Sequence, residues 1–291
     1  MAYTGTGTEQ DPYVVTTLTE LVALMGNDIY IKIGADIDAS QEDAYKEPVA
    51  SYVSLRGHIY ADGIKTISNV IVEYLNAIYI ENCDIKNIFF KNWIHRKTGS
   101  GESVNTMRST IKNCSFSMEM VDDGNGFDLL GKSSSFNSPS NVENCTFYVK
   151  FTSGTTGLIA SANVLKYVNV DKCTFMFENL KCSHLSLAGS GSKVDNCAFI
   201  GNITISTTTD NTITPFTNDS TYTKSKIIFA LNISSDTNFK LFFGSYVRYV
   251  MVDKDVLSEN ISISFGDSTC RALTTGQIQS QQYLEDIGFL P

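Results

Sequence analysis

The chain has little proline, little histidine, no excess of basic residues and no long apolar run. Its 291 residues include 5 prolines, 1 tryptophan and 3 histidines, and 31 acidic residues outnumber 22 basic ones, for a formal net charge of −9. This balance argues against a nucleic-acid binder, because such proteins concentrate Lys and Arg on one face. No run approaches the roughly 18 apolar residues that mark a spanning helix, so we also expect no membrane contact.

Motifs of common catalytic and metal sites are missing as well. The sequence has no Cys-x-x-Cys spacing for zinc, no Gly-x-Ser-x-Gly elbow, no Walker loop and no zincin helix. We therefore expect no cofactor. The stretch from Met1 to Gly7 carries neither a charged n-region nor an apolar h-region. We expect synthesis in the cytoplasm, with any release by lysis or by a route without a cleaved signal.

What the chain does contain is Phe, Tyr and a repeated phrase. The 17 Phe and 14 Tyr favour strands over helices. The phrase occurs five times, as Ile80-Glu-Asn82-Cys83-Asp-Ile85, Ile111-Lys-Asn113-Cys114-Ser-Phe116, Val142-Glu-Asn144-Cys145-Thr-Phe147, Val170-Asp-Lys172-Cys173-Thr-Phe175 and Val194-Asp-Asn196-Cys197-Ala-Phe199. Its cysteines are 31, 31, 28 and 24 residues apart. A recurrence of about 20 to 50 residues indicates one structural unit stacked on the next.

The spacing inside the phrase predicts a bent strand. A β-branched residue, Cys and Phe stand at its first, fourth and sixth positions, with Ile for Phe in the first copy. A straight strand would send the first and fourth side chains to opposite faces. Asn precedes Cys in four of the five copies, and Asn is the non-glycine residue that best tolerates the left-handed conformation of a sharp bend. Each copy is therefore predicted to be strand, one-residue corner and strand, with the apolar side chains inward.

Stacking such coils predicts a ladder of corner asparagines and buried cysteines. Its members are Asn82, Cys83, Asn113, Cys114, Asn144, Cys145, Cys173, Asn196 and Cys197. Lys172 replaces Asn in the fourth copy and is expected to interrupt the ladder. A second match, from Ile85 to Phe90 with its own Asn87, overlaps the first copy, and the sequence leaves open which asparagine makes the equivalent corner. We expect the cysteines to act as small buried apolar side chains.

This arrangement resembles the coils of the right-handed parallel β-helix of the pectate-lyase-like superfamily, over residues from about 28 to 265. The resemblance implies an all-β solenoid and is specific for fold, not for activity. We predict a single domain over residues 1–291, with a lead and capping helix in 1–27, coils in 28–265 and a C-terminal cap in 266–291. Thr16 or Thr17 is expected to begin the capping helix, and Thr274 or Thr275 a short helix that Gly288 ends.

Two clusters are candidate sites. An acidic stretch rich in Gly and Asn could gather around a hard cation, although a solvated turn explains it as well; its carboxylates are Asp122, Asp123 and Asp128. A basic-aromatic group could bind a sugar or a carboxylate, although the exposed start of a loop is the alternative; it consists of Trp93, His95 and Arg96. The sequence singles out no catalytic residue.

Three functions follow from these observations. The first is a non-enzymatic virion structural protein of a bacteriophage, such as a capsid decoration, head-fibre or tail-associated protein, because a rod whose backbone groups are all paired resists unfolding outside the cell. The resemblance to phage and surface β-helix proteins agrees with it. Its partners would be other virion proteins and copies of itself in a trimer.

The other two functions involve glycans. A glycan- or host-binding adhesin would use aromatic and Asn-rich loops, such as 203–223, against a cell surface. A polysaccharide lyase or hydrolase, including a depolymerase, would need two or three acidic residues from adjacent coils converging in a groove. The adhesin and the virion protein can be one and the same.

Overall fold

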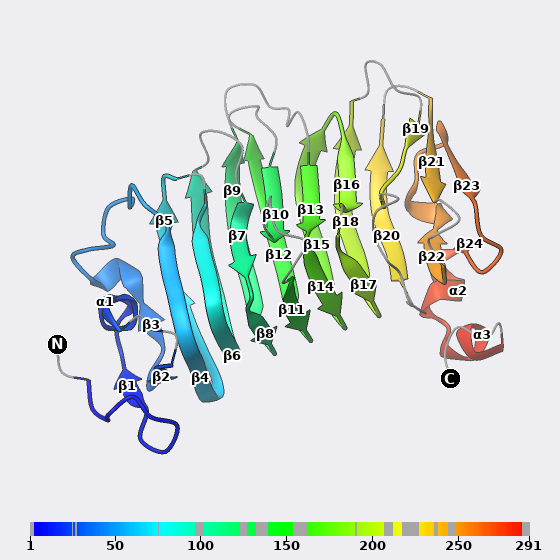
Figure 1. The fold of residues 1–291 in the computed structure, drawn as a ribbon. Coiled ribbons are helices and arrows are strands. Elements are labelled where there is room, and N and C mark those ends of the chain that lie inside the picture. Colours follow the sequence, from blue (N-terminus) through cyan, green and yellow to red (C-terminus); the bar gives the residue numbers. More distant parts are fainter. Residues whose placement is uncertain are drawn as a thin grey trace.

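The chain forms a parallel β-solenoid, in which successive coils stack side by side along one axis (Figure 1). The computed structural model describes residues 3–24, 26, 28–74, 76–96, 102–122, 127–131, 139–153, 162–189, 191–206, 212–216, 227–235, 238–243 and 248–286. Within these ranges a sheet of 21 strands and a second sheet of 3 strands hold the coils together. The predicted all-β solenoid with short helices near its two ends is confirmed.

Each coil contributes strands to several faces of the rod. The strands are β1 (Tyr13–Val15), β2 (Tyr30–Ile33), β3 (Ile37–Asp38), β4 (Val53–Ser68), β5 (Ile71–Val72), β6 (Ile78–Arg96), β7 (Glu102–Met107), β8 (Thr110–Lys112), β9 (Ser115–Asp122), β10 (Phe127–Gly131), β11 (Ser140–Glu143), β12 (Thr146–Ser153), β13 (Ala162–Lys166), β14 (Val168–Asp171), β15 (Thr174–Cys182), β16 (Leu185–Ala188), β17 (Lys193–Asp195), β18 (Ala198–Ile205), β19 (Thr212–Ile213), β20 (Ile227–Ser234), β21 (Phe239–Phe243), β22 (Val250–Asp253), β23 (Ile261–Phe265) and β24 (Arg271–Leu273). The helices are α1 (Leu18–Ala23), α2 (Thr275–Gln279) and α3 (Gln281–Asp286), with 3₁₀ turns at Ala39–Gln41 and Lys254–Val256.

Corner residues lie above one another in the predicted left-handed conformation. Asn113 and Asn144 both have a φ of 52°. The side-chain N–H of Asn144 donates to the Asn113 oxygen at 2.8 Å, and that of Asn113 donates to the Asn87 oxygen at 3.3 Å. Lys172 adopts the same conformation, with a φ of 53°. Because lysine has no side-chain acceptor, the chain of amides is interrupted at Lys172, as the sequence predicts.

The first copy of the phrase belongs to a different corner, which corrects the predicted ladder. Strand β6 pairs Phe90 with Phe116, so Asn87, with a φ of 61°, is the corner in register with the later copies. An isoleucine there takes the place of the cysteine. Asn82 also has a positive φ, of 46°, but it forms the preceding corner of the same coil, and Cys83 is buried beside it. Two overlapping matches were present because this coil has asparagine corners at Asn82 and Asn87, five positions apart.

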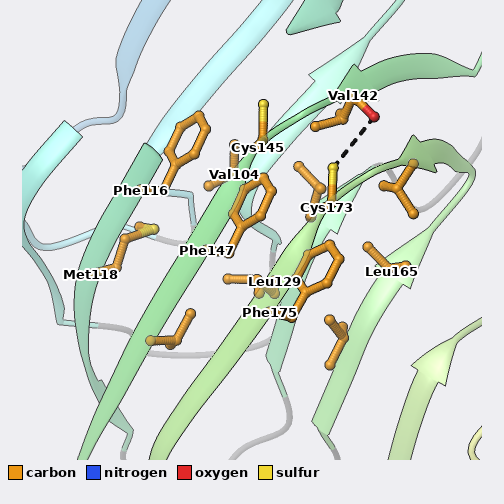
Figure 2. Close-up of a cluster of buried hydrophobic side chains, with 14 of the residues drawn as sticks. Val104, Phe116, Met118, Leu129, Val142, Cys145, Phe147, Leu165, Cys173 and Phe175 are labelled. Carbon is orange, nitrogen blue, oxygen red and sulfur yellow. Dashed lines mark hydrogen bonds between the residues drawn. The ribbon is translucent and has the colours of Figure 1, made fainter. Parts of the chain in front are cut away.

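Phenylalanine rings stack through the centre of the rod. Neighbouring ring centroids lie 4.7, 4.8, 5.0 and 5.1 Å apart, with ring planes within 12° of parallel, for Phe90, Phe116, Phe147, Phe175 and Phe199. These spacings match the separation of about 4.8 Å between strands. In Figure 2, Phe116, Phe147 and Phe175 lie beside the thiols of Cys145 and Cys173. All seven cysteines are buried and none forms a disulfide, as expected for small apolar side chains.

Helix α1 covers the first coil. Thr17 is its N-cap, as predicted, and accepts a backbone N–H from the first turn at 3.1 Å. Leu18 and Leu21 point into the core and are 0% and 1% exposed. The carboxylate of Glu42 accepts the backbone N–H groups of Leu18 and Thr19 at 2.6 and 2.8 Å. The apolar end of the stack is thereby sealed at the N-terminus.

The C-terminal helices pack on the side of the rod. Thr274 caps α2 with a complete capping box to Gln277, which confirms the predicted helix start. Met251 points away from the core, yet it is 2% exposed, because α2 and α3 cover it with side chains that include Tyr283. Figure 1 shows both helices beside β22 and β24, at the end of the stack opposite α1. The predicted helix end at Gly288 lies outside the described residues.

Candidate functional site

One outer side of the rod carries two continuous rows of polar and aromatic side chains. We call it the groove face; it is the outward side of β2, β4, β6, β8, β11, β14 and β17. Strand register stacks the first row as Tyr30, His58, Asp84, Thr110, Asn141, Asn169 and Lys193. It stacks the second row as Lys32, Tyr60, Lys86, Lys112, Glu143, Asp171 and Asp195.

The rows face outward because each alternates with a buried aliphatic residue. Ile59 lies between His58 and Tyr60, and Val170 lies between Asn169 and Asp171, and both aliphatic side chains are 2% exposed. A side-chain period of two residues along a strand therefore places every member of the two rows on the surface. Seven strands at a spacing of about 4.8 Å give the rows a length of about 29 Å.

The N-terminal part of the groove face holds an aromatic hollow of about 540 Å³. Tyr30 stacks on His58 with ring centroids 4.3 Å apart and planes at 19°. His58 Nδ1 lies 3.0 Å from a carboxylate oxygen of Asp84, a contact that orients the imidazole ring. Tyr60 and Lys86 also line this hollow. Lys86 makes no ion pair with any residue that the structure describes, so its ammonium group is available to a ligand.

The C-terminal part holds a second hollow, of about 520 Å³, with amide and carboxylate groups. Lys112 Nζ lies 2.7 Å from Glu143, and this contact lowers the pKa of the Glu143 carboxyl. Burial, with the neighbouring Asp171 carboxylate, raises the pKa of Asp195. The side-chain N–H of Asn196, at the corner beside this row, donates to Asp171 at 2.9 Å.

The two hollows adjoin. Asp84 and Lys86 line the first hollow, and Thr110 and Lys112, on the next strand of the sheet, line the second. A linear ligand can therefore lie along the whole groove face. Its surroundings change from aromatic rings with charges of both signs near β2 to amides with charges of both signs near β17.

The order of these side chains along the groove face suits an extended sugar chain. Aromatic rings such as Tyr60 pack against the C–H face of a sugar ring, because both surfaces are apolar and flat. Amides, ammonium groups and carboxylates supply donors and acceptors to hydroxyl groups. The length of the rows also suits a polymer, since each coil adds two more outward side chains along the rod.

The predicted basic-aromatic patch does not form as expected, because two of its three side chains lie inside the rod. Trp93 is 1% exposed and donates its indole N–H to the Ile67 carbonyl at 3.0 Å. His95 is 0% exposed, with Nε2 2.7 Å from the Tyr74 carbonyl. Only Arg96 reaches the surface. Strand β6 continues through these residues, so alternation turns Trp93 and His95 inward where the sequence predicts the start of a loop.

The predicted acidic cluster is spread over different strands. Asp122 ends β9, whereas Asp128 lies in β10, where it accepts from Asn163 at 2.7 Å and lies 3.4 Å from Lys166 Nζ. Asp123 lies outside the described residues. The part of the chain that the structure describes contains no group of three His, Cys, Asp or Glu placed to hold a metal ion. Asp128 thus has a lysine and an amide as its partners.

The groove face was missed by sequence reasoning, although one signal for it was present. The residue between the aliphatic and the corner Asn of each phrase is Lys112, Glu143, Asp171 and Asp195 in the last four copies. A charged residue at a fixed position of every repeat indicates one charged row along the rod. Tyr30, His58 and Tyr60 stand outside the phrase, so only the strand pairing places them in the same rows.

Comparison with protein-family models, with curated proteins and with solved structures finds no match to this chain. Among the described residues, no helix combines the length and apolar character needed to cross a membrane. The function is therefore argued from the groove face itself.

Proposed function

We propose that this protein is a structural rod of a bacteriophage virion that binds an extended glycan along its groove face without cleaving it. The proposal of glycan binding rests on the two continuous rows of polar and aromatic side chains and on the two adjoining hollows that they line. The virion assignment is supported by analogy of fold, through the resemblance of the repeated phrase to right-handed β-helices of the pectate-lyase-like superfamily, including those of phages. A rod with a stacked aromatic core and a covered first coil resists unfolding, and a protein exposed outside a cell needs this resistance.

A binding role suits the groove face because its groups are distributed along the rod. An enzyme concentrates its reacting groups at one point, whereas here donors and acceptors are spread over seven strands and the rings lie on β2 and β4. Many weak contacts of this kind give affinity for a polymer through their number. Cell-surface polysaccharides of a bacterial host are polymers with such repeats.

The test of glycan binding uses substitutions in the first hollow. Purified protein is incubated with capsular and lipopolysaccharide glycans of candidate host bacteria, and binding is measured by biolayer interferometry. We expect Tyr60→Ala and Lys86→Ala to weaken binding about tenfold each, through loss of a stacking surface and of a cation. Lys150→Ala is the matched control, because Lys150 is an exposed lysine on β12, away from the groove face. Equal binding by all four proteins would overturn the groove as the glycan site.

The virion assignment has a separate test. Particles released from the source culture are purified on a density gradient, and an antibody to the chain is applied in immunogold electron microscopy. Label on the particle surface is expected. Label confined to soluble fractions would contradict a structural role, whatever the binding results show.

The hydrogen-bonded His58 and Asp84 favour one alternative, a polysaccharide lyase or hydrolase. A carboxylate that orients an imidazole is a common way to prepare a general base. Any glycan that binds is therefore incubated with the protein and analysed for shorter products by size-exclusion chromatography. Products that disappear with His58→Gln would replace the binding role with an enzymatic one.

A further inference from the structure

A second surface, on the neighbouring face of the same coils, gathers three tyrosines. Tyr52 precedes β4, Tyr74 follows β5 and Tyr79 lies in β6. The ring of Tyr52 stands between the other two, with centroid distances of 5.7 Å to Tyr74 and 5.3 Å to Tyr79. We call this group the tyrosine platform. It is separated from the groove face by the corner at Asn82.

The platform is exposed where large apolar side chains are normally covered. Tyr52 and Tyr74 are 40% and 39% exposed, and they are two of the four large apolar side chains exposed among the described residues. The other two, Ile64 and Ile200, are single aliphatic residues. Scattered single side chains need no explanation, but a contiguous exposed patch of rings indicates a binding surface.

The backbone under the platform is held in place by a buried histidine. His95 is 0% exposed, with Nε2 2.7 Å from the Tyr74 carbonyl and Nδ1 3.2 Å from Ser103 Oγ. An arrangement of exposed rings on a fixed backbone is prepared for a ligand before the ligand arrives, so less ordering is needed on binding.

The rim of the platform is polar and carries charges of both signs. Arg56 lies 2.7 Å from Glu81, and Arg96 lies 2.8 Å from Glu73, the residue before Tyr74. Each of these two arginines is paired with a glutamate, and a third arginine, Arg108, lies near Tyr79, so the rim offers hydrogen bonds and charges of both signs. A phosphate or a sulfated chain would meet two carboxylates there, which argues against nucleic acids and anionic polymers.

We propose that the tyrosine platform is a binding site for a neutral sugar, separate from the groove face, in which Tyr52 and Tyr74 stack on the C–H face of one sugar ring. The three phenol hydroxyls and the two ion pairs hydrogen-bond its hydroxyl groups. Three rings make a small surface compared with the roughly 800 Å² per partner of a typical protein interface, which favours a sugar over a folded protein. Together with the groove face, the platform would hold a branched or folded glycan at two points.

The test combines chemical protection with binding. A panel of defined neutral oligosaccharides containing glucose, galactose, mannose, rhamnose or N-acetylhexosamines is added before nitration by tetranitromethane, and nitrated tyrosines are located by mass spectrometry. At least one oligosaccharide is expected to protect Tyr52 and Tyr74 while leaving Tyr60 on the groove face reactive. Protection of no platform tyrosine by any member of the panel would overturn the proposal.

Variants then identify the groups responsible. Binding of the protecting oligosaccharide is expected to fall about tenfold or more in Tyr52→Ala and Tyr74→Ala, and to persist in Tyr74→Phe, which keeps the ring. Ile64→Ala is the matched control, since Ile64 is 74% exposed and lies outside the platform. Circular dichroism checks that each variant is folded. Unchanged binding by folded Tyr52→Ala would contradict the stacking role.

The groove-face proposal and the platform proposal can each be contradicted without the other. Loss of binding in Tyr60→Ala but not in Tyr52→Ala would leave the groove face as the glycan site and overturn the platform. The reverse result would support the platform and overturn the groove. Capture of a folded protein that competes with no oligosaccharide would show the platform to be a protein-docking surface and would overturn the sugar assignment.

Discussion

The phenylalanine in the last four copies of the phrase has a different role from the cysteine two residues before it. Phe147 is 0% exposed and stacks between Phe116 and Phe175, at centroid distances of 4.8 and 5.0 Å. Cys145 is also buried, but its side chain is small, and Sγ lies 3.2 Å from the Glu143 carbonyl as a weak donor. The rings therefore contribute most of the packing between neighbouring coils.

Replacement of Phe147 by Ala is expected to lower the free energy of unfolding by about 3 to 5 kcal/mol, because it leaves a cavity between two stacked rings. Cys145→Ala is the control in the same coil, and its effect is expected to be much smaller. Urea unfolding followed by far-UV circular dichroism measures both. Equal and small losses would mean that the ring stack carries little of the stability.

At the scale of one element, helix α1 depends on a carboxylate far away in the sequence. Six residues are too few for a helix that is stable alone. The helix is held by its N-cap Thr17, by the buried Leu18 and Leu21, and by Glu42, which accepts two N–H groups of the first turn. Glu42 thus fastens the covering helix to the segment that follows β3.

Glu42→Ala is expected to speed hydrogen exchange at the amides of Leu18 and Thr19, because both lose their acceptor. The loss of stability is expected to be about 1 to 2 kcal/mol, as for removal of a helix cap. Glu47→Ala serves as control, since Glu47 is an exposed carboxylate in the same segment. Exchange measured by mass spectrometry that is equally slow in both variants would show that Glu42 does not hold α1.

At the scale of the whole molecule, coils contact mainly their neighbours, so stability is a sum along the rod. The seven buried thiols are distributed along the rod from Cys83 to Cys270, so their reactivity reports the opening of individual coils. Burial raises the pKa of the Cys182 thiol to about 12, and it also raises the pKa of Cys83 and of Cys270. At neutral pH these thiols are both protonated and covered.

We therefore expect the native protein to react slowly with a thiol reagent such as DTNB, since access to every buried thiol requires opening. Reaction of all the thiols at one rate, equal to the rate of unfolding, is expected if the rod opens as a unit. Faster labelling of Cys270 alone would show that the C-terminal coils open separately. Rapid labelling of Cys182 in the native protein would contradict its burial.

Much of the architecture could be predicted from local pattern. The phrase showed that coils stack, that Asn turns the corner and that Ile or Val, Cys and Phe point inward, because all three depend on neighbouring residues and on a side-chain period of two. The two helix starts at Thr17 and Thr274 also follow from local capping. The inward direction of Trp93 and His95 did not, because it depends on how far β6 continues.

The candidate sites were decided by the tertiary structure. Tyr30, His58 and Asp84 are 28 and 26 residues apart in the chain, and only the register of β2, β4 and β6 brings them into one row. The same holds for Tyr52, Tyr74 and Tyr79. A repeat tells which residues of one coil face outward, whereas the length of each loop sets which outward residues of successive coils become neighbours. Loop length varies from coil to coil. Which side chains lie next to one another on the surface is therefore decided only by the pairing of strands in the folded protein.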